Sequence, residues 1–315
     1  MSKLDELKAE LKSLGKEYAK IKTLRESERK AFGEALNAKK ARILSAIKNS
    51  ENEADSSALA PIDLTAPFAE NSSPLPASKG TKHPLTTELD LVAEIYRNMG
   101  FTIIESRQLD DEFHMFESLN FPEGHPARDG YDTFRTREGF IPPAHTSTMQ
   151  YRALTRFRSD LDNYGQIAVV IPGRVFRNED VDVTHEHTFY QCEGIFVSKS
   201  ATLGQLLATW KNFFETYYGQ KLNIKTQPGF FPFTEPSLEF QIEKPAALGG
   251  KGDDWLEMGG CGMIHPNVLK TAGIDPDVYK GFAWGGGIDR LVMLKYGISD
   301  VRYFESGKLD FLKEF

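Results

Sequence analysis

The sequence predicts an α+β fold: an antiparallel sheet flanked by helices, preceded by an antiparallel helical hairpin. Segments with strand-like alternation outnumber the helical segments between them, so there are too few crossover helices for a doubly wound parallel sheet. An apolar seam with steps of three and four near the N-terminus predicts the hairpin, a short coiled coil. The 315 residues, 40% of them hydrophobic, suffice for one large core and a smaller appendage.

The predicted hairpin spans residues 1–48. Thr23 and Glu26 have the spacing of a capping box that would start the second helix. The apolar positions are Leu4, Leu7, Leu11, Leu14, Tyr18 and Ile21 in the first helix, and Phe32, Leu36, Ile43, Leu44 and Ile47 in the second. The segment carries 13 Lys+Arg against 7 Asp+Glu, a balance of +6, whereas the remaining residues sum to -13. We predict that this basic arm meets a polyanion; the alternative is a solvated dimerisation coil.

Residues 49–83 are rich in Ser, Ala, Pro and Asn and are predicted to form a linker, with the globular body at 84–315. We expect a helix at Leu85–Gly100, capped by Thr86 or Thr87. A strand at Phe101–Ser106 and a helix at Tyr151–Leu161 follow. Further strands are expected at 166–177, 188–198, 222–227, 237–243 and 254–260, and further helices at 201–219 and 287–296, the last after a glycine-rich turn.

Several classes of protein are disfavoured. Apolar runs such as residues 167–171 are too short to span a membrane, and no secretory signal is visible, so we expect no membrane association. Cys192 and Cys261 are the only cysteines and lack zinc-site spacing, as expected in the reducing cytoplasm. The sequence contains neither HExxH nor Gly-x-Ser-x-Gly, which disfavours a zinc protease and a serine hydrolase.

The segment 173–196, GRVFRNEDVDVTHEHTFYQCEGIF, predicts two strands joined by a charged loop. On the returning strand, alternation places Phe189, Gln191 and Glu193 on one face: a ring suited to stacking on a purine, and two groups that could bind a small polar head group. An ordinary solvent-facing surface is the alternative. Arg177, where the outgoing strand ends, could bind a phosphate through two parallel donors; the alternative is a surface salt bridge with Glu179 or Asp180.

Two later segments add candidate groups. In GFAWGGGIDR, Gly285–Gly287 precede a helix N-terminus, where glycines permit close approach and the helix end favours anions. Arg290, one turn into that helix, could then reach a terminal phosphate; a surface arginine is the alternative. In FFPFTEPSLEF, Phe231 and Phe233 share a face and could form an aromatic pocket, or be ordinary core residues.

In this order, these segments resemble the α subunit of bacterial-type phenylalanyl-tRNA synthetase, a class II aminoacyl-tRNA synthetase. The resemblance runs from His83 to Phe315 and includes SLNFPEGHPARDGYDTF, AHTSTMQYRAL and EMGGCGMIHPNVL. GRVFRNE corresponds to class II motif 2 and GFAWGGGIDR to motif 3. Trp284 and Asp289 depart from the usual Phe and Glu of motif 3, and the N-terminal hairpin is short for this family.

The resemblance implies a class II catalytic domain and a role for each matching residue. Arg177 and Arg290 would be the catalytic groups, holding the α- and γ-phosphates of ATP. The remaining ATP-binding residues would be Glu179, Phe189, Gly285 and Gly287. The phenylalanine-binding residues would be His145, Ser147, Gln150, Gln191, Glu193, Phe231, Phe233 and Ala283. Glu235 would share a Mg²⁺ ion with the β subunit.

The same resemblance implies ATP-dependent activation of L-phenylalanine and its transfer to tRNA(Phe), within an (αβ)2 heterotetramer whose hairpin contacts tRNA. One alternative is a synthetase-like paralogue that binds tRNA without catalysis. Another is an adenylate-forming enzyme of the same fold that charges phosphoserine, whose pocket should carry extra cationic groups in place of Phe231 and Phe233.

Overall fold

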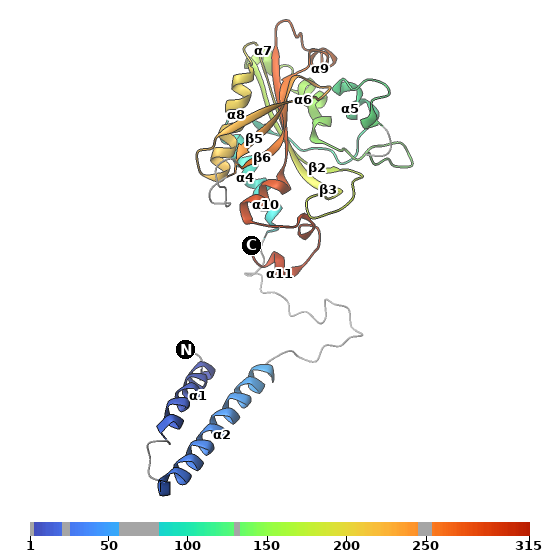
Figure 1. Ribbon diagram of the computed structural model, residues 1–315. Coiled ribbons are helices and arrows are strands. Elements are labelled where there is room, and N and C mark those ends of the chain that lie inside the picture. Colours follow the sequence, from blue (N-terminus) through green and yellow to red (C-terminus); the bar gives the residue numbers. More distant parts are fainter. Residues whose placement is uncertain (1–2, 21–25, 57–81, 129–132, 245–253) are drawn as a thin grey trace. The chain divides into compact units, whose positions relative to one another are not determined.

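The computed structural model describes residues 3–20, 26–56, 82–128, 133–244 and 254–315 (Figure 1). The chain divides into two compact units, Met1–Lys79 and Gly80–Phe315. Among the described helices, none is long and apolar enough to cross a lipid bilayer.

The first unit is a helical hairpin, as predicted, made of α1 (Lys3–Lys20) and α2 (Glu26–Ser56). Leu14 and Leu36 are buried in its seam, and the Tyr18 hydroxyl donates to Asn37 Oδ1 at 2.6 Å. The prediction for Leu44 is wrong, because its side chain is 46% exposed. Helix α2 runs past residue 48, where we expected the hairpin to end, and the predicted cap Thr23 lies outside the described residues.

The second unit is built on a seven-stranded sheet in the order β1-β2-β3-β7-β6-β5-β4. Every neighbouring pair is antiparallel except β1 with β2, which confirms a mostly antiparallel sheet. The strands are β1 (Thr102–Ile103), β2 (Gln166–Phe176), β3 (Thr188–Ser198), β4 (Ile224–Gly229), β5 (Thr234–Glu243), β6 (Trp255–Ile264) and β7 (Lys280–Gly287).

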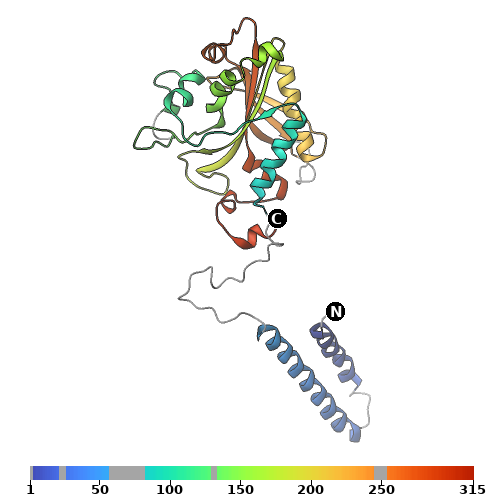
Figure 2. The same cartoon turned by 180° about the vertical axis from the view of Figure 1, so that it is seen from behind.

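Helices cover both faces of this sheet. The helices and 3-10 turns are α4 (Pro84–Asn98), α5 (Glu112–Met115), η3 (Glu117–Leu119), η4 (Pro126–Arg128), η5 (Thr146–Met149), α6 (Gln150–Arg156), α7 (Asp160–Asn163), α8 (Leu203–Tyr218), α9 (Pro266–Thr271), α10 (Ile288–Tyr296), η7 (Val301–Tyr303) and α11 (Leu309–Leu312). Helices α4 and α8, cyan and yellow, lie together on one face, while α5, α6 and α9 lie on the other (Figures 1 and 2).

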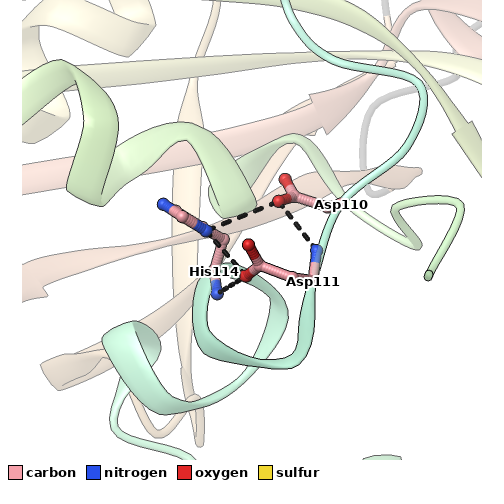
Figure 3. A group of neighbouring side chains, drawn as sticks. All are labelled: Asp110, Asp111 and His114. Carbon is pink, nitrogen blue, oxygen red and sulfur yellow. Dashed lines mark hydrogen bonds and ion pairs between the residues drawn. The ribbon is translucent and has the colours of Figure 1, made fainter. Parts of the chain in front are cut away.

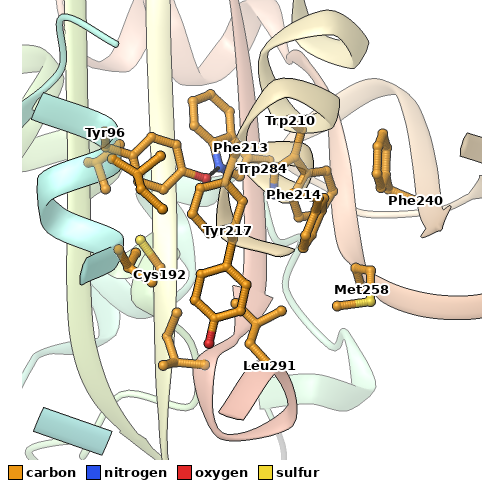
Figure 4. Close-up of a cluster of buried hydrophobic side chains, with 14 of the residues drawn as sticks. Tyr96, Cys192, Trp210, Phe213, Phe214, Tyr217, Phe240, Met258, Trp284 and Leu291 are labelled. Atoms are coloured by element: carbon orange, nitrogen blue, oxygen red, sulfur yellow. Dashed lines mark hydrogen bonds between the residues drawn. The ribbon is translucent and has the colours of Figure 1, made fainter. Parts of the chain in front are cut away.

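Each face has its own apolar core. On the α4/α8 face, Trp284 of the central strand β7 packs against Tyr96 and Phe213, and its Nε1–H donates to the Tyr96 hydroxyl at 2.9 Å (Figure 4). On the other face, Ile195 and Ala283 of neighbouring strands join a second cluster with residues of α6 and α9. The candidate site lies on this second face, where it continues the run of side chains on β3.

Local signals account for the best-predicted elements. Thr202 and Gln205 form a reciprocal capping box at the start of α8, and Gly219 ends it in the left-handed conformation. Strands β2 and β3 match the prediction to within one residue at each end.

Other boundaries differ from the prediction. Helix α4 is capped by His83 rather than Thr86 or Thr87, because the imidazole Nδ1 accepts from the Leu85 amide at 3.2 Å. The strand expected at 101–106 pairs over two residues only, since β1 is an edge strand with a single neighbour. The helix expected at 151–161 is broken into α6 and α7.

The glycine-rich turn predicted before α10 is also wrong. Gly285–Gly287 lie within β7 and pair with Glu193, Cys192 and Gln191 of β3. They are extended because all three pair with β3, and Gly285 also pairs with Gly260 of β6. A side chain does not fit at Gly286, where a Cβ atom would lie 2.7 Å from the Met258 carbonyl oxygen. The three glycines therefore form part of the floor of the site.

Candidate functional site

One cavity of about 1610 Å³ opens on the second face of the sheet. All of the predicted site residues line it except Gln150 and Glu235. Those that do are His145, Ser147, Arg177, Glu179, Phe189, Gln191, Glu193, Phe231, Phe233, Ala283, Gly285, Gly287 and Arg290. They come from β3, β7, the end of β2, the η5 segment, the β4–β5 connection and α10, so the fold gathers groups more than a hundred residues apart.

Arg177 is held at the base of the β2–β3 loop. Its backbone amide donates to the His187 carbonyl at 2.9 Å, and its Nε–H donates to the Ala144 carbonyl at 3.0 Å. The guanidinium carbon lies 5.1 Å from the centre of the Phe189 ring. The ion pair with Glu179 that we considered as an alternative is present, at 3.4 Å between Nη1 and Oε1, but both side chains are more than a third exposed. Such a pair contributes little, so the guanidinium remains available to an anion.

Glu193 brings a buried carboxylate to the cavity wall. It is 2% exposed, and it accepts from Ser147 Oγ at 2.9 Å and from Gln150 Nε2 at 2.6 Å. Burial raises its pKa to about 7, although the two hydrogen bonds act in the opposite direction. An acceptor-only group held in this way suits a cationic ligand such as an ammonium ion. Gln150 thus lies behind Glu193 rather than on the cavity surface.

The η5 segment presents a neutral histidine beside these groups. Burial, helped by the nearby charge of Arg177, lowers the pKa of His145 to about 3. Its Nδ1 is buried and has no hydrogen-bond partner among the described residues. Next to it, the Thr146 amide donates to Gln191 Oε1 at 3.3 Å, which ties η5 to β3. His145 and Gln191 are therefore positioned to bind a small polar group.

The aromatic end of the cavity has three rings. Phe231 and Phe233 are stacked with centroids 5.9 Å apart, and Phe121 lies 6.1 Å from Phe233. The Phe231 ring packs directly against Gly260: a Cβ atom on Gly260 would lie 2.5 Å from Cζ of the ring, so only glycine fits there. Phe121 was not predicted from the sequence; it lies in the SLNFPEGHP stretch, which carried the family resemblance without a role for this ring.

The β7 side closes the cavity with small residues. Ala283 is 2% exposed and pairs with Ile195 on one side and Gly262 on the other. A Cβ atom on Gly285 would lie 2.9 Å from Glu193 Oε2, so a side chain there would displace the carboxylate. Arg290 follows on α10, where its side chain is exposed and lines the cavity.

The two departures from the usual motif 3 are buried residues that line the cavity wall. The Asp289 carboxylate is 5% exposed and accepts from the Tyr190 amide at 2.6 Å, which ties the start of α10 to β3. Burial raises its pKa to about 7. The Trp284 indole occupies the space above Gly194, where a Cβ atom would come within 2.0 Å of Cζ2. Both residues support the frame that carries the site.

The carboxylates differ in how well they suit a metal ion. Glu235 is 73% exposed and lies 3.3 Å from Nε2 of His265, outside the cavity, so its oxygens would suit an ion shared with another chain. Glu239 and Glu257 do line the cavity, and Glu257 is exposed. The sequence did not single out these two glutamates, although Glu257 precedes the glycine pair that opens onto the cavity.

A second acidic group, formed by Asp110, Asp111 and His114, is explained by local structure (Figure 3). Asp111 caps α5 by accepting from the His114 amide at 2.9 Å. Both oxygens of Asp110 accept from the Arg152 guanidinium, at 2.7 and 2.9 Å. Because that positive charge already neutralises the buried carboxylate, the cluster is a poor cation site.

Comparison with known proteins agrees with this geometry. A family model described as the tRNA synthetases class II core domain (F) matches residues 62–315. The phenylalanine--tRNA ligase alpha subunit of Afipia carboxidovorans is 40% identical across 100% of this chain and 87% of its own length. The corresponding proteins of Brucella anthropi and Brucella canis are 40% and 39% identical, covering 94% and 90% of this chain and 85% and 82% of their own lengths. The chain therefore belongs to the phenylalanine--tRNA ligase alpha subunit family of class II aminoacyl-tRNA synthetases.

Proposed function

We propose that the chain activates L-phenylalanine with ATP and transfers it to tRNA(Phe), as the catalytic subunit of an (αβ)2 heterotetramer. One observation carries the proposal: a single cavity combines a buried carboxylate, an aromatic end and two arginines. Glu193 suits the ammonium group of an amino acid, Phe231 and Phe233 suit its phenyl ring, and Arg177 and Arg290 suit a triphosphate. The alpha-subunit names of the relatives support a β partner.

The first step would need no side-chain nucleophile. A carboxylate oxygen of phenylalanine attacks the α-phosphorus of ATP, the bond to the bridging oxygen breaks, and pyrophosphate leaves. Arg177 would stabilise the charge on the α-phosphate, with Phe189 stacked on the adenine. Arg290 would bind the γ-phosphate, as the family resemblance implies. Catalysis then consists of positioning and electrostatic stabilisation, which the fixed guanidinium of Arg177 supports.

In the second step, the 2′-hydroxyl of the terminal adenosine of tRNA would attack the carbonyl carbon of the adenylate, and AMP would leave. Mg²⁺, when bound, would neutralise charge on the pyrophosphate. The cavity-lining Glu257 and Glu239 are candidates to hold it, and the exposed Glu235 suits an ion shared with the β subunit. A reaction that uses tRNA and ATP would take place in the cytoplasm.

Pyrophosphate exchange tests this proposal directly. The purified complex with the β subunit should exchange labelled pyrophosphate into ATP when phenylalanine is present. A complex that binds tRNA but shows no phenylalanine-dependent exchange would favour the non-catalytic paralogue instead. Exchange with phosphoserine is not expected. Its phosphate would need a lysine or arginine at the aromatic end, where the described residues place Phe231 and Phe233 instead.

A further inference from the structure

We propose that Asn120 is a positioning residue that fixes the aromatic end of the cavity and thereby sets affinity and selectivity for the substrate side chain. The inference rests on the proposed function, since it assumes that this end binds phenylalanine. Asn120 is half-buried and follows η3; it does not line the cavity itself. Any effect on the substrate must therefore act through its neighbours.

The backbone of Asn120 is in the left-handed conformation, with φ 61° and ψ 24°. Within the described residues it is the one non-glycine position with a positive φ. Asparagine tolerates this conformation better than most residues because its short polar side chain can form local or directed hydrogen bonds. The turn both ends η3 and orients the amide group.

That amide joins two segments that are distant in sequence. Its Nδ2 donates to the Pro232 carbonyl at 2.8 Å, and its Oδ1 accepts from Asn267 Nδ2 at 2.9 Å. Pro232 lies between Phe231 and Phe233, so the first bond holds the backbone segment from which both rings project. The second bond fixes the direction of the amide by anchoring it to the start of α9.

The β4–β5 connection is also held on either side of Pro232, where the Phe231 carbonyl accepts from the Thr234 amide at 3.1 Å. The Phe231 amide donates to Ser237 Oγ at 3.1 Å, and the Phe233 carbonyl accepts from the His265 amide at 2.9 Å. Pro232 has no N–H, so its carbonyl is its only backbone hydrogen-bonding group, and Asn120 supplies the donor. Loss of that donor would leave the Pro232 carbonyl, between the two rings, without the hydrogen bond that Asn120 supplies.

Asn120 also connects this turn to the opposite wall. The next residue, Phe121, lines the cavity and faces Phe233. One residue thus sets the spacing between Phe121 and the Phe231/Phe233 pair. An apolar pocket rejects a larger analogue mainly by fit, so a small separation of its walls should weaken phenylalanine binding and admit tyrosine more readily.

Two variants separate the side-chain bond from the backbone turn. Asn120→Asp keeps the turn and the acceptor for Asn267 but removes the N–H that reaches Pro232, whereas Asn120→Gly keeps the turn and removes the side chain. Asn223→Ala is the control, because it also removes a side-chain amide that donates a hydrogen bond, here to Glu243 Oε2 at the end of β5, and neither Asn223 nor Glu243 lines the cavity. Each is made in the full chain and purified with the β subunit.

Both Asn120 variants should raise the KM for phenylalanine in pyrophosphate exchange by roughly fivefold to tenfold, the scale of one lost hydrogen bond. The ratio of kcat/KM for tyrosine to that for phenylalanine should increase by a similar factor. The kcat, the KM for ATP and the Tm should stay close to wild type, as should every value for Asn223→Ala. Calorimetric titration with phenylalanine should show the same loss of affinity.

Unchanged phenylalanine affinity in both variants would overturn the positioning role. So would a parallel loss for ATP with a lower Tm, which would indicate general destabilisation, or a loss confined to Asn120→Gly. A wild-type complex that binds neither phenylalanine nor ATP would instead remove the proposed function, a result visible without any variant.

Discussion

Burial disfavours the negative charge of Glu193, which the proposed substrate needs as a partner for its ammonium group. A pKa of about 7, raised from the ordinary value by burial, means that the empty site takes up a proton as the pH falls below neutrality. A protonated carboxyl has no charge to offer an ammonium group, so we expect the KM for phenylalanine to rise between pH 8 and pH 6. Exchange kinetics across this range would measure the effect.

The variant Glu193→Gln tests the assignment of that titration. It should remove the pH dependence of phenylalanine binding in this range and weaken binding by about thirtyfold or more, on the scale of 2 kcal/mol for a buried charge pair.

The same titration affects folding, because the folded state binds more protons than the unfolded chain between the ordinary glutamate pKa and about 7. Glu193 therefore contributes stability at low pH that is lost as the pH rises through this window. Wild-type pH dependence in the variant would assign the titration to another group.

In the proposed function, Ala283 sets the depth of the phenylalanine pocket. Its methyl group is buried beside Ile195 and Gly262, and it lines the cavity. Ala283→Gly should raise kcat/KM for para-chlorophenylalanine by about tenfold or more, the scale of one methyl-sized space in an apolar pocket. Ala272→Gly is the control, because Ala272 is buried in the same apolar cluster but does not line the cavity. Equal kinetics for the analogue in both variants would contradict this pocket assignment.

Helix α10 carries Arg290, and hydrogen bonds from its last turn join it to α4. Glu88 of α4 is 1% exposed; both its oxygens lie 2.8 Å from Lys295 Nζ, and the Tyr296 hydroxyl donates to Oε1 at 2.6 Å. Glu88→Ala would leave these groups without their acceptor, so we expect the free energy of unfolding to fall by about 3 kcal/mol. The midpoint of urea denaturation would report the loss.

Asp90 offers a comparison on the same helix. Its pair with Lys82 is short, at 2.8 Å, but both side chains are about two-thirds exposed. Asp90→Ala should therefore change stability by about 0–1 kcal/mol. Similar losses for Glu88→Ala and Asp90→Ala would show that the buried network does not hold α10.

At the scale of the whole molecule, the basic hairpin is a separate unit. If it contacts tRNA, deletion of residues 1–56 should raise the KM for tRNA and flatten its dependence on salt, because fewer counterions are released on binding. Pyrophosphate exchange should persist, since every cavity-lining residue lies in the second unit. Unchanged tRNA affinity combined with altered oligomeric state would favour the dimerisation coil.

Elements whose signals are local were predictable from the residue pattern. The β2–β3 pair and the capped helix α8 follow from alternation and capping. Alternation also placed Phe189, Gln191 and Glu193 on one face, where all three line the cavity. These features depend on neighbours within a few residues, so the residue pattern is sufficient to predict them.

Features that depend on backbone far away in the sequence could be read only from the folded molecule. Gly285–Gly287 form part of a central strand rather than a turn because all three pair with β3 and Gly285 also pairs with β6. The two strands approach closely there, since a Cβ atom on Gly259 would lie 2.1 Å from the Gly285 carbonyl oxygen. The raised pKa of Glu193 and the hydrogen bond from Asn120 to the Pro232 carbonyl likewise depend on residues that are distant in sequence. Burial and long-range hydrogen bonds are properties of the packed molecule, and no local pattern encodes them.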